Sequence, residues 1–153
     1  MRTAHDSVLV MQVGDLSDQA FCLTDEEGWQ HWWNVTQGLR LGMKNHLPQV
    51  FSLSQAEITP ESILKHNSEI DETYAITTDL TKPLLFVPFK GKDQLIDGWH
   101  RLMKAALMGQ DDLSGYFLTQ KEADACLIMR FPPGQGIEWT DEERELYSQV
   151  CRP

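Results

Sequence analysis

Long apolar runs are missing from this sequence. No stretch reaches the roughly 18 consecutive apolar residues that a membrane-spanning helix needs. The first residues, Met1 to Asp6, also lack the basic and then apolar layout of a secretory signal peptide. These two absences predict a cytoplasmic protein that makes no contact with a membrane.

Paired cysteines and clustered histidines are missing too. The three cysteines, Cys22, Cys126 and Cys151, lie far apart, and no Cys-x-x-Cys pair occurs. The five histidines are scattered, and none lies at metal-ligand spacing from a cysteine. We therefore expect free thiols and no zinc site built from a local motif.

Positive charge is scarce. The chain has 13 lysines and arginines against 23 aspartates and glutamates, a net charge of −10. Such a surface repels a phosphate backbone, so we expect weak binding to DNA. Residues 82–104 are the exception, where five cations meet only Asp93 and Asp97: Lys82, Lys90, Lys92, Arg101 and Lys104. This local excess is typical either of solvated lysines around a turn or of an anion site, and both interpretations stay open here.

Length and composition limit the number of domains and the class of protein. A chain of 153 residues suffices for one core, and its hydrophobic fraction of 41% and charged fraction of 24% are ordinary for a globular protein. We predict a single domain over 1–153, with an N-terminal extension at 1–48, a core at 49–130, and a C-terminal loop and helix at 131–153. The fold class expected is α+β, a small mixed sheet flanked by helices after a hairpin-helix extension.

The first part of the chain predicts the hairpin and its helix. Thr24 and Glu27 form a capping-box pattern, and Trp29, Trp32 and Trp33 then recur at helical spacing. These tryptophans are typical of a core face, with base stacking as the alternative. The elements expected here are strands at 8–13 and 20–23, a helix ending near Gly38, and a loop over 40–48.

Turn and cap residues divide the rest of the chain. Thr59 before Pro60 predicts a helix start, and Gly109 predicts a helix end. The elements expected are strands at 50–53, 84–87, 94–96 and 115–118, helices at 60–66 and 98–108, and helices opening at the capping boxes Thr119/Glu122 and Thr140/Glu143.

The strand-turn-helix around Gly98 carries the chemistry. A strand that turns into a helix leaves backbone N–H groups and the positive end of the helix dipole at the turn, which favours an anion. Gly98 allows close approach of a ligand, His100 offers an imidazole donor, and Arg101 can grip two phosphate oxygens. Lys82 and Lys104 would complete a cradle for the phosphates if their elements pack beside the turn.

Asp97 has two interpretations of equal weight. Its carboxylate could hold a magnesium ion that a bound nucleotide brings with it. It could also cap the helix that follows, as aspartate commonly does. The two roles do not exclude each other.

A family resemblance covers residues 50–118. Gly98, Arg101, Ala105 and Gly109 are in register with the Gly-x-x-Arg helix of the ParB/sulfiredoxin superfamily, and His100 matches its Gly-x-His-Arg version. The strands expected at 83–87 and 94–96 and the segment 50–63 resemble the strands and first helix of that domain. The first 48 residues are outside the resemblance.

The resemblance implies a pocket for the phosphates of ATP or CTP with Mg²⁺, formed by Gly98, His100 and Arg101. Kinase-like members carry a glutamate soon after the first strand, and Glu61, or less readily Glu57, takes a comparable position. For Glu61 the alternative is a carboxylate that suits the first turn of its helix.

The sequence departs from several members of the superfamily. Trp99 stands where sulfiredoxins carry their reactive cysteine, so peroxiredoxin repair is excluded. The Gly-Glu-Arg-Arg form and a following helix-turn-helix are also lacking, which excludes a full chromosome-partition protein. The chain is more similar to stand-alone members of the plasmid fertility-inhibition type, to which ATP hydrolysis and DNA cleavage are ascribed.

The leading hypothesis is therefore a nucleoside triphosphatase with or without DNase activity. Phosphates would be held by Gly98, His100 and Arg101, Asp97 would bind magnesium, and Glu61 would orient or deprotonate the attacking water. The alternatives are a nucleotide-sensing or protein-interaction module, with a component of a DNA-transfer machine as partner, and a small-molecule kinase. A pocket retained only as scaffold and an acidic surface that imitates DNA also stay open.

Overall fold

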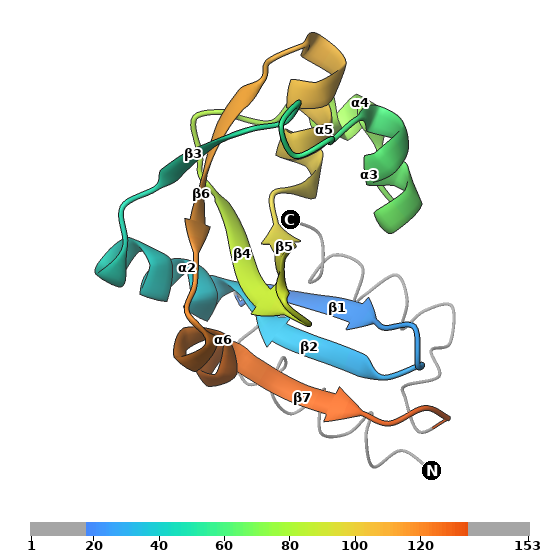
Figure 1. Ribbon diagram of the computed structural model, residues 1–153, viewed down its shortest axis with the longest axis vertical. Coiled ribbons are helices and arrows are strands. Elements are labelled where there is room, and N and C mark those ends of the chain that lie inside the picture. Colours follow the sequence, from blue (N-terminus) through green and yellow to red (C-terminus); the bar gives the residue numbers. More distant parts are fainter. Residues whose placement is uncertain (1–17, 135–153) are drawn as a thin grey trace.

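The structure of the protein, a computed structural model, describes residues 18–134 (Figure 1). The expected strand at 8–13 and the expected helix that opens at Thr140 lie outside these residues. Within the described range the fold is α+β, as the sequence predicts, but it has two sheets where one was expected.

The first sheet has three antiparallel strands in the order β1-β2-β7. The second is mixed, in the order β3-β6-β4-β5, with β4 and β6 parallel and the other pairs antiparallel. The strands are β1 (Ala20–Thr24), β2 (Gln30–Asn34), β3 (Gln49–Ser52), β4 (Leu84–Phe89), β5 (Lys92–Asp97), β6 (Asp112–Phe117) and β7 (Leu127–Phe131).

The helices of the described range are α2 (Val35–Asn45), α3 (Pro60–His66), α4 (Glu72–Ile76), α5 (Trp99–Met108) and α6 (Gln120–Cys126). The helices α3, α4 and α5 lie together at one end of the molecule, and the first sheet lies at the other (Figure 1). Thr59 caps α3 and the capping box at Thr119 opens α6, as predicted. The second member of the box at Thr59, Ser62, was not predicted, and neither were α4 and β7.

The tryptophans of the first sheet correct the sequence prediction. Trp32 and Trp33 lie in β2 rather than in a helix, and Trp33 pairs with Phe21 of β1. Successive residues of a strand face opposite sides, so Trp32 enters a small cluster with Phe131 while Trp33 enters the main core. Both are nearly fully buried, which confirms the core interpretation over base stacking.

The segment after Thr24 is a turn, and the predicted capping box does not form. Oδ1 of Asp25 accepts the backbone N–H groups of Glu27 and Trp29, which closes the connection between β1 and β2. An aspartate that satisfies N–H groups two and four residues ahead stabilises such a turn. The helix of this region begins later, at Val35, with Asn34 as its cap.

Two glycines inside α2 explain why the helix does not end near Gly38 as predicted. A Cβ at Gly38 would lie 2.9 Å from the side chain of Leu85, and one at Gly42 would lie 2.8 Å from that of Tyr116. These glycines therefore let the helix pack closely against the second sheet, a role that outweighs their low helix propensity. Residues 40–45, predicted as loop, continue the helix.

The N-terminal segment shares the main core with the rest of the described chain. Phe21, Trp33 and Val35 belong to the same hydrophobic cluster as residues of the second sheet and α5. The Trp99 ring of α5 stacks on Phe21 with centroids 6.2 Å apart. The segment 18–48 is thus packed into the same core as residues 49–130.

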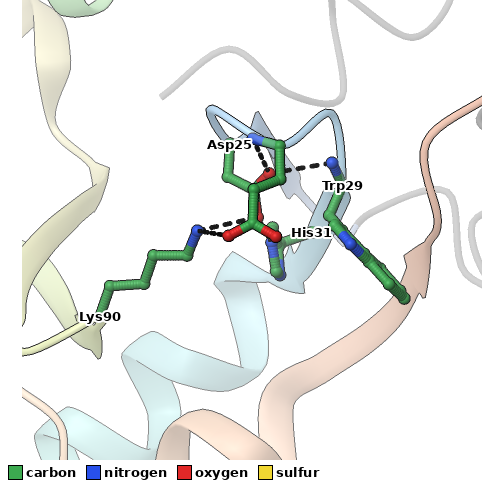
Figure 2. Close-up of polar contacts among 5 residues, drawn as sticks. Asp25, Trp29, His31 and Lys90 are labelled. Carbon is green, nitrogen blue, oxygen red and sulfur yellow. Dashed lines mark hydrogen bonds and ion pairs between the residues drawn. The ribbon is translucent and has the colours of Figure 1, made fainter.

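A polar cluster also joins the two sheets. Oδ2 of Asp25, in the β1–β2 turn, accepts from Nε2 of His31 at 2.9 Å and from Nζ of Lys90 at 3.2 Å (Figure 2). Lys90 lies in the turn between β4 and β5, where it adopts a left-handed conformation with φ 51°. The His31 hydrogen bond, opposed by burial and aided by the Trp29 N–H and by Lys90, holds the pKa of Asp25 far below its usual range. The ionised Asp25 carboxylate is therefore the group that connects the β1–β2 turn to the β4–β5 turn.

Candidate functional site

A pocket of about 600 Å³ lies at the N-terminus of α5. Five of the seven predicted site residues line it: Lys82, Asp97, Gly98, His100 and Arg101. Six further residues line it that the sequence did not point to: Gln19, Leu39, Tyr74, Thr77, Thr78 and Asp79. The fold therefore brings most of the predicted site together in one cavity.

Gly98 is required by the turn that begins α5. Its φ of 103° is left-handed, and a Cβ there would lie 2.7 Å from the side chain of Leu84 and 2.9 Å from Nη2 of Arg101. As the N-cap residue it offers the helix no side-chain acceptor. An uncapped helix start presents N–H groups and partial positive charge, so this end of α5 suits an anion.

Asp97 and Arg101 are paired with each other. Nη2 of Arg101 donates to Oδ2 of Asp97 at 3.1 Å and to the carbonyl oxygen of Pro83 at 3.3 Å. Burial raises the pKa of Asp97, whose residue is 3% exposed, while the Arg101 guanidinium opposes that rise. Nε of Arg101 is buried and has no hydrogen-bond partner in the described part of the chain.

The pairing with Arg101 bears on both interpretations of Asp97, as helix cap and as magnesium ligand. The N-cap of α5 is Gly98, so the prediction that Asp97 caps the helix is wrong. As a ligand for the magnesium ion of a nucleotide Asp97 fits poorly, because its carboxylate is buried and bound to Arg101. The exposed Asp79 is a more open carboxylate on the same pocket.

His100 connects α5 to α4. Its Nε2 accepts the backbone N–H of Asp71 at 3.2 Å, and its ring lies edge-on to Tyr74 with centroids 4.7 Å apart. A ring nitrogen that accepts a hydrogen bond carries no proton and cannot donate one to a phosphate. The contact made by Nε2 is therefore structural, although the ring borders the pocket.

The remaining predicted residues differ in their surroundings. Lys82 lines the pocket and is exposed. Nζ of Lys104 donates to the carbonyl oxygen of Thr78 at 2.6 Å, so Lys104 holds the pocket wall rather than facing the cavity. Glu61 is exposed in the first turn of α3, and neither it nor Glu57 is among the residues that line the pocket.

The residues that the sequence analysis missed come from two places. Tyr74 belongs to α4, and Asp79 follows it in a turn where its Oδ1 accepts the N–H and the hydroxyl of Thr81. These hydrogen bonds lower the pKa of Asp79 and keep its carboxylate ionised. Gln19 and Leu39 belong to the N-terminal segment, and the apolar spacing of residues 35–45 would have found Leu39 had the glycines been accepted inside a helix.

The described residues contain neither a cluster of metal-ligating side chains nor a membrane-spanning helix. Across residues 18–134 there is no group of three or more histidine, cysteine, aspartate and glutamate side chains placed to hold a metal ion. The same range contains no helix that is long and apolar enough to cross a membrane.

Comparison with protein-family models, with curated proteins and with solved structures finds no match for the chain. The likeness to the ParB/sulfiredoxin superfamily therefore rests on the sequence pattern of residues 50–118 alone, with Gly98, His100 and Arg101 at its centre. What the geometry defines is an α+β protein with a pocket at the N-terminus of α5, lined by charged residues of both signs.

Proposed function

We propose that this chain is a nucleotide-binding protein of the ParB/sulfiredoxin type, whose pocket at the start of α5 holds the phosphate groups of ATP or CTP. The observation that carries the proposal is the convergence of Lys82, Arg101 and the uncapped N-terminus of α5 on one cavity. Two carboxylates, Asp79 and Asp97, also line the pocket, and Asp97 is paired with Arg101, so Lys82 and the N-terminus of α5 are the positive groups that a phosphate would meet first.

The size and lining of the pocket support a ligand larger than a single phosphate. Its volume of about 600 Å³ lies inside the range of roughly 300–1,000 Å³ that small-molecule sites occupy. The side-chain amide of Gln19 adds a donor and an acceptor of the kind that orient such a ligand. The hydroxyl groups of Thr77 and Thr78 donate to the carbonyl oxygens of Tyr74 and Ala75, so they can serve a ligand only as acceptors.

The geometry supports binding more directly than hydrolysis. Glu61 is not in the pocket, Nε2 of His100 is an acceptor, and the Asp97 carboxylate is paired with Arg101. A nucleotide-sensing module that binds without turnover is therefore the function that the described residues favour, and a protein partner for it stays part of the proposal.

Nucleotide hydrolysis is the second candidate, and one observation favours it. Asp79 places an exposed, ionised carboxylate on the same pocket, where it could position an attacking water. DNA cleavage, phosphate transfer to a small molecule and a role in blocking plasmid transfer derive from the family resemblance alone. They remain proposals that no contact in the pocket supports.

Binding is tested by calorimetry with ATP and with CTP in the presence of Mg²⁺, on the wild type beside Lys82→Ala. We expect binding to weaken about tenfold in Lys82→Ala, because a charge-assisted hydrogen bond contributes roughly 1.5–3 kcal/mol. Lys92→Ala is the matched control, since Lys92 is also exposed but lies at the other end of β5 from Gly98 and does not line the pocket. Absence of binding by the wild type to both nucleotides would overturn the proposal.

Phosphate release on the same samples separates the two candidates. A wild type that binds nucleotide and releases no phosphate is a sensing module. Release that Asp79→Asn abolishes while nucleotide binding persists would instead establish hydrolysis.

A further inference from the structure

The pocket has a wall that lies outside the strand-turn-helix. Gln19 precedes β1, and Leu39 lies in α2, so both come from the first 48 residues. All the site residues predicted from the sequence lie in residues 49–130. The fold instead packs α2 against the second sheet, because Gly38 and Gly42 permit the close approach, and this places Leu39 beside the cavity.

The two groups of lining residues differ in chemistry. Lys82, Arg101 and the start of α5 supply positive charge, which suits phosphates. Leu39 and Tyr74 supply an apolar and an aromatic surface, and neither carries a charge at neutral pH. Purely inorganic phosphate would gain nothing from such surfaces, whereas a flat nucleobase packs well against them.

Both side chains, Leu39 and Tyr74, keep part of their surface outside the hydrophobic core. Leu39 is half-buried, packing partly against the main cluster, and the Tyr74 side chain is 39% exposed while its ring meets His100 edge-on. Each therefore keeps surface that a ligand could cover. Gln19 is exposed beside them and carries both a donor and an acceptor, the combination that reads the edge of a base.

We propose that Gln19 and Leu39 of the N-terminal segment, together with Tyr74 of α4, are the specificity-determining part of the nucleotide site, with Leu39 and Tyr74 holding the base and Gln19 reading its edge. This inference rests on the proposed function, since it assigns the other end of the same ligand. It makes the ligand a nucleoside polyphosphate rather than an inorganic polyphosphate.

The experiment compares ATP, CTP and inorganic tripolyphosphate as probes in calorimetry. We expect Leu39→Ala to weaken the preferred nucleotide about tenfold, the discrimination that a small apolar contact provides, and to leave tripolyphosphate binding unchanged. Leu41→Ala is the matched control, because Leu41 lies on the same helix and is half-buried but lines a different cavity. It should change neither affinity.

A second variant keeps the test valid if Leu39→Ala is poorly folded. Tyr74→Ser removes a side chain that is 39% exposed, and we expect the same loss for the nucleotide alone. Thermal unfolding of each variant shows whether the fold persists.

The outcomes distinguish the inference from the proposed function. Equal affinity of the wild type for tripolyphosphate and both nucleotides would overturn the inference and leave the phosphate site intact. Variants at Leu39 and Tyr74 that weaken all three probes equally would overturn it too. A wild type that binds none of them would overturn the proposed function and the inference with it.

Discussion

Asp97, the last residue of β5, and Arg101, in the first turn of α5, form an ion pair in which Nη2 donates to Oδ2 at 3.1 Å. The pair is largely buried, and the same guanidinium nitrogen also reaches the carbonyl oxygen of Pro83. The cation proposed to hold a phosphate is thus already neutralised by a carboxylate of the same turn. A phosphate that enters the pocket must compete with Asp97 for Arg101.

Asp97→Asn should therefore tighten the binding of ATP or CTP. The substitution keeps the shape of the side chain and removes a negative charge beside the proposed phosphate position. We expect at least about a fivefold gain in affinity, because like charges 4 Å apart repel by about 1 kcal/mol even in bulk water. Calorimetry at low ionic strength measures it.

Asp93→Asn is the control for that experiment, since it removes the same charge from an exposed position of β5. The gain should be confined to Asp97→Asn. Equal or weaker binding by this variant would contradict the competition between Asp97 and phosphate, and it would point instead to a carboxylate that assists the ligand.

Glu122 provides a prediction about pH. Burial opposes its ionisation, but the Thr119 N–H and the side chains of His46 and Asn45 donate to the carboxylate and lower its pKa to about 2. A carboxyl whose pKa is lower in the folded state than the ordinary 4.5 stabilises the fold above pH 4.5. That contribution is lost as the pH falls from 4.5 towards 2.

Glu122→Gln should consequently lower Tm at pH 7, by roughly 5 °C. A glutamine amide would also place an N–H₂ group against the donor of Asn45. The difference from the wild type should shrink in unfolding scans at successively lower pH. Asp124→Asn, at an exposed position of the same helix, should show little change. A deficit that is the same at pH 7 and pH 3 would show that the effect is not electrostatic.

Much of the second sheet and α5 could be predicted because their signals are local. Gly98 and Gly109 lie at the two ends of α5 in left-handed conformations, and Thr59 and Thr119 cap the helices that follow them. In these places the residue that determines the structure is adjacent to the element that it begins or ends.

In the first sheet the strand expected at 20–23 is β1, but β2 and β7 could not be predicted in the same way. The strand β7 begins at Leu127, directly after α6 ends at Cys126, so no turn residue marks the change. In β2 both faces are buried, and the apolar run therefore lacks the alternation that distinguishes a strand from a helix.

The site was predicted mainly where it is contiguous in sequence, from Asp97 to Arg101, with Lys82 in addition. Arg101 also donates to the Pro83 carbonyl, and His100 accepts from the Asp71 N–H, both of them backbone groups. Backbone donors and acceptors are the same for nearly all residues, so the sequence gives no sign of them. Lys104 was predicted to bind phosphate, but its ammonium group donates to the carbonyl oxygen of Thr78, another backbone group that the sequence does not reveal.

The contact between the sheets leads to a prediction about stability. Asp25→Asn keeps an acceptor for the Glu27 and Trp29 N–H groups but removes the charge that binds His31 and Lys90 (Figure 2). We expect a lower Tm than in the wild type, and a larger loss than in Lys90→Met, because Lys90 is half-exposed and exposed ion pairs contribute little.

Glu27→Gln is the control for this cluster. Glu27 is exposed and lies 3.8 Å from Nζ of Lys90, so removing its charge should leave Tm nearly unchanged. If Asp25→Asn unfolds at the same temperature as Glu27→Gln, the carboxylate does not hold the two sheets together.

Gly98 and Gly109 provide a matched pair at the two ends of α5. Both have positive φ, 103° and 73°, but a Cβ at Gly98 meets Leu84 and Arg101 whereas one at Gly109 meets open space. Gly109→Ala should lower the free energy of unfolding by about 1 kcal/mol, the cost of a left-handed conformation for alanine. Gly98→Ala should lower it by roughly 3 kcal/mol, because overpacking is added to the same strain. Chemical unfolding of the two variants measures the difference. Equal losses would mean that the turn into α5 adjusts freely, and then Gly98 would be explained by its backbone conformation alone.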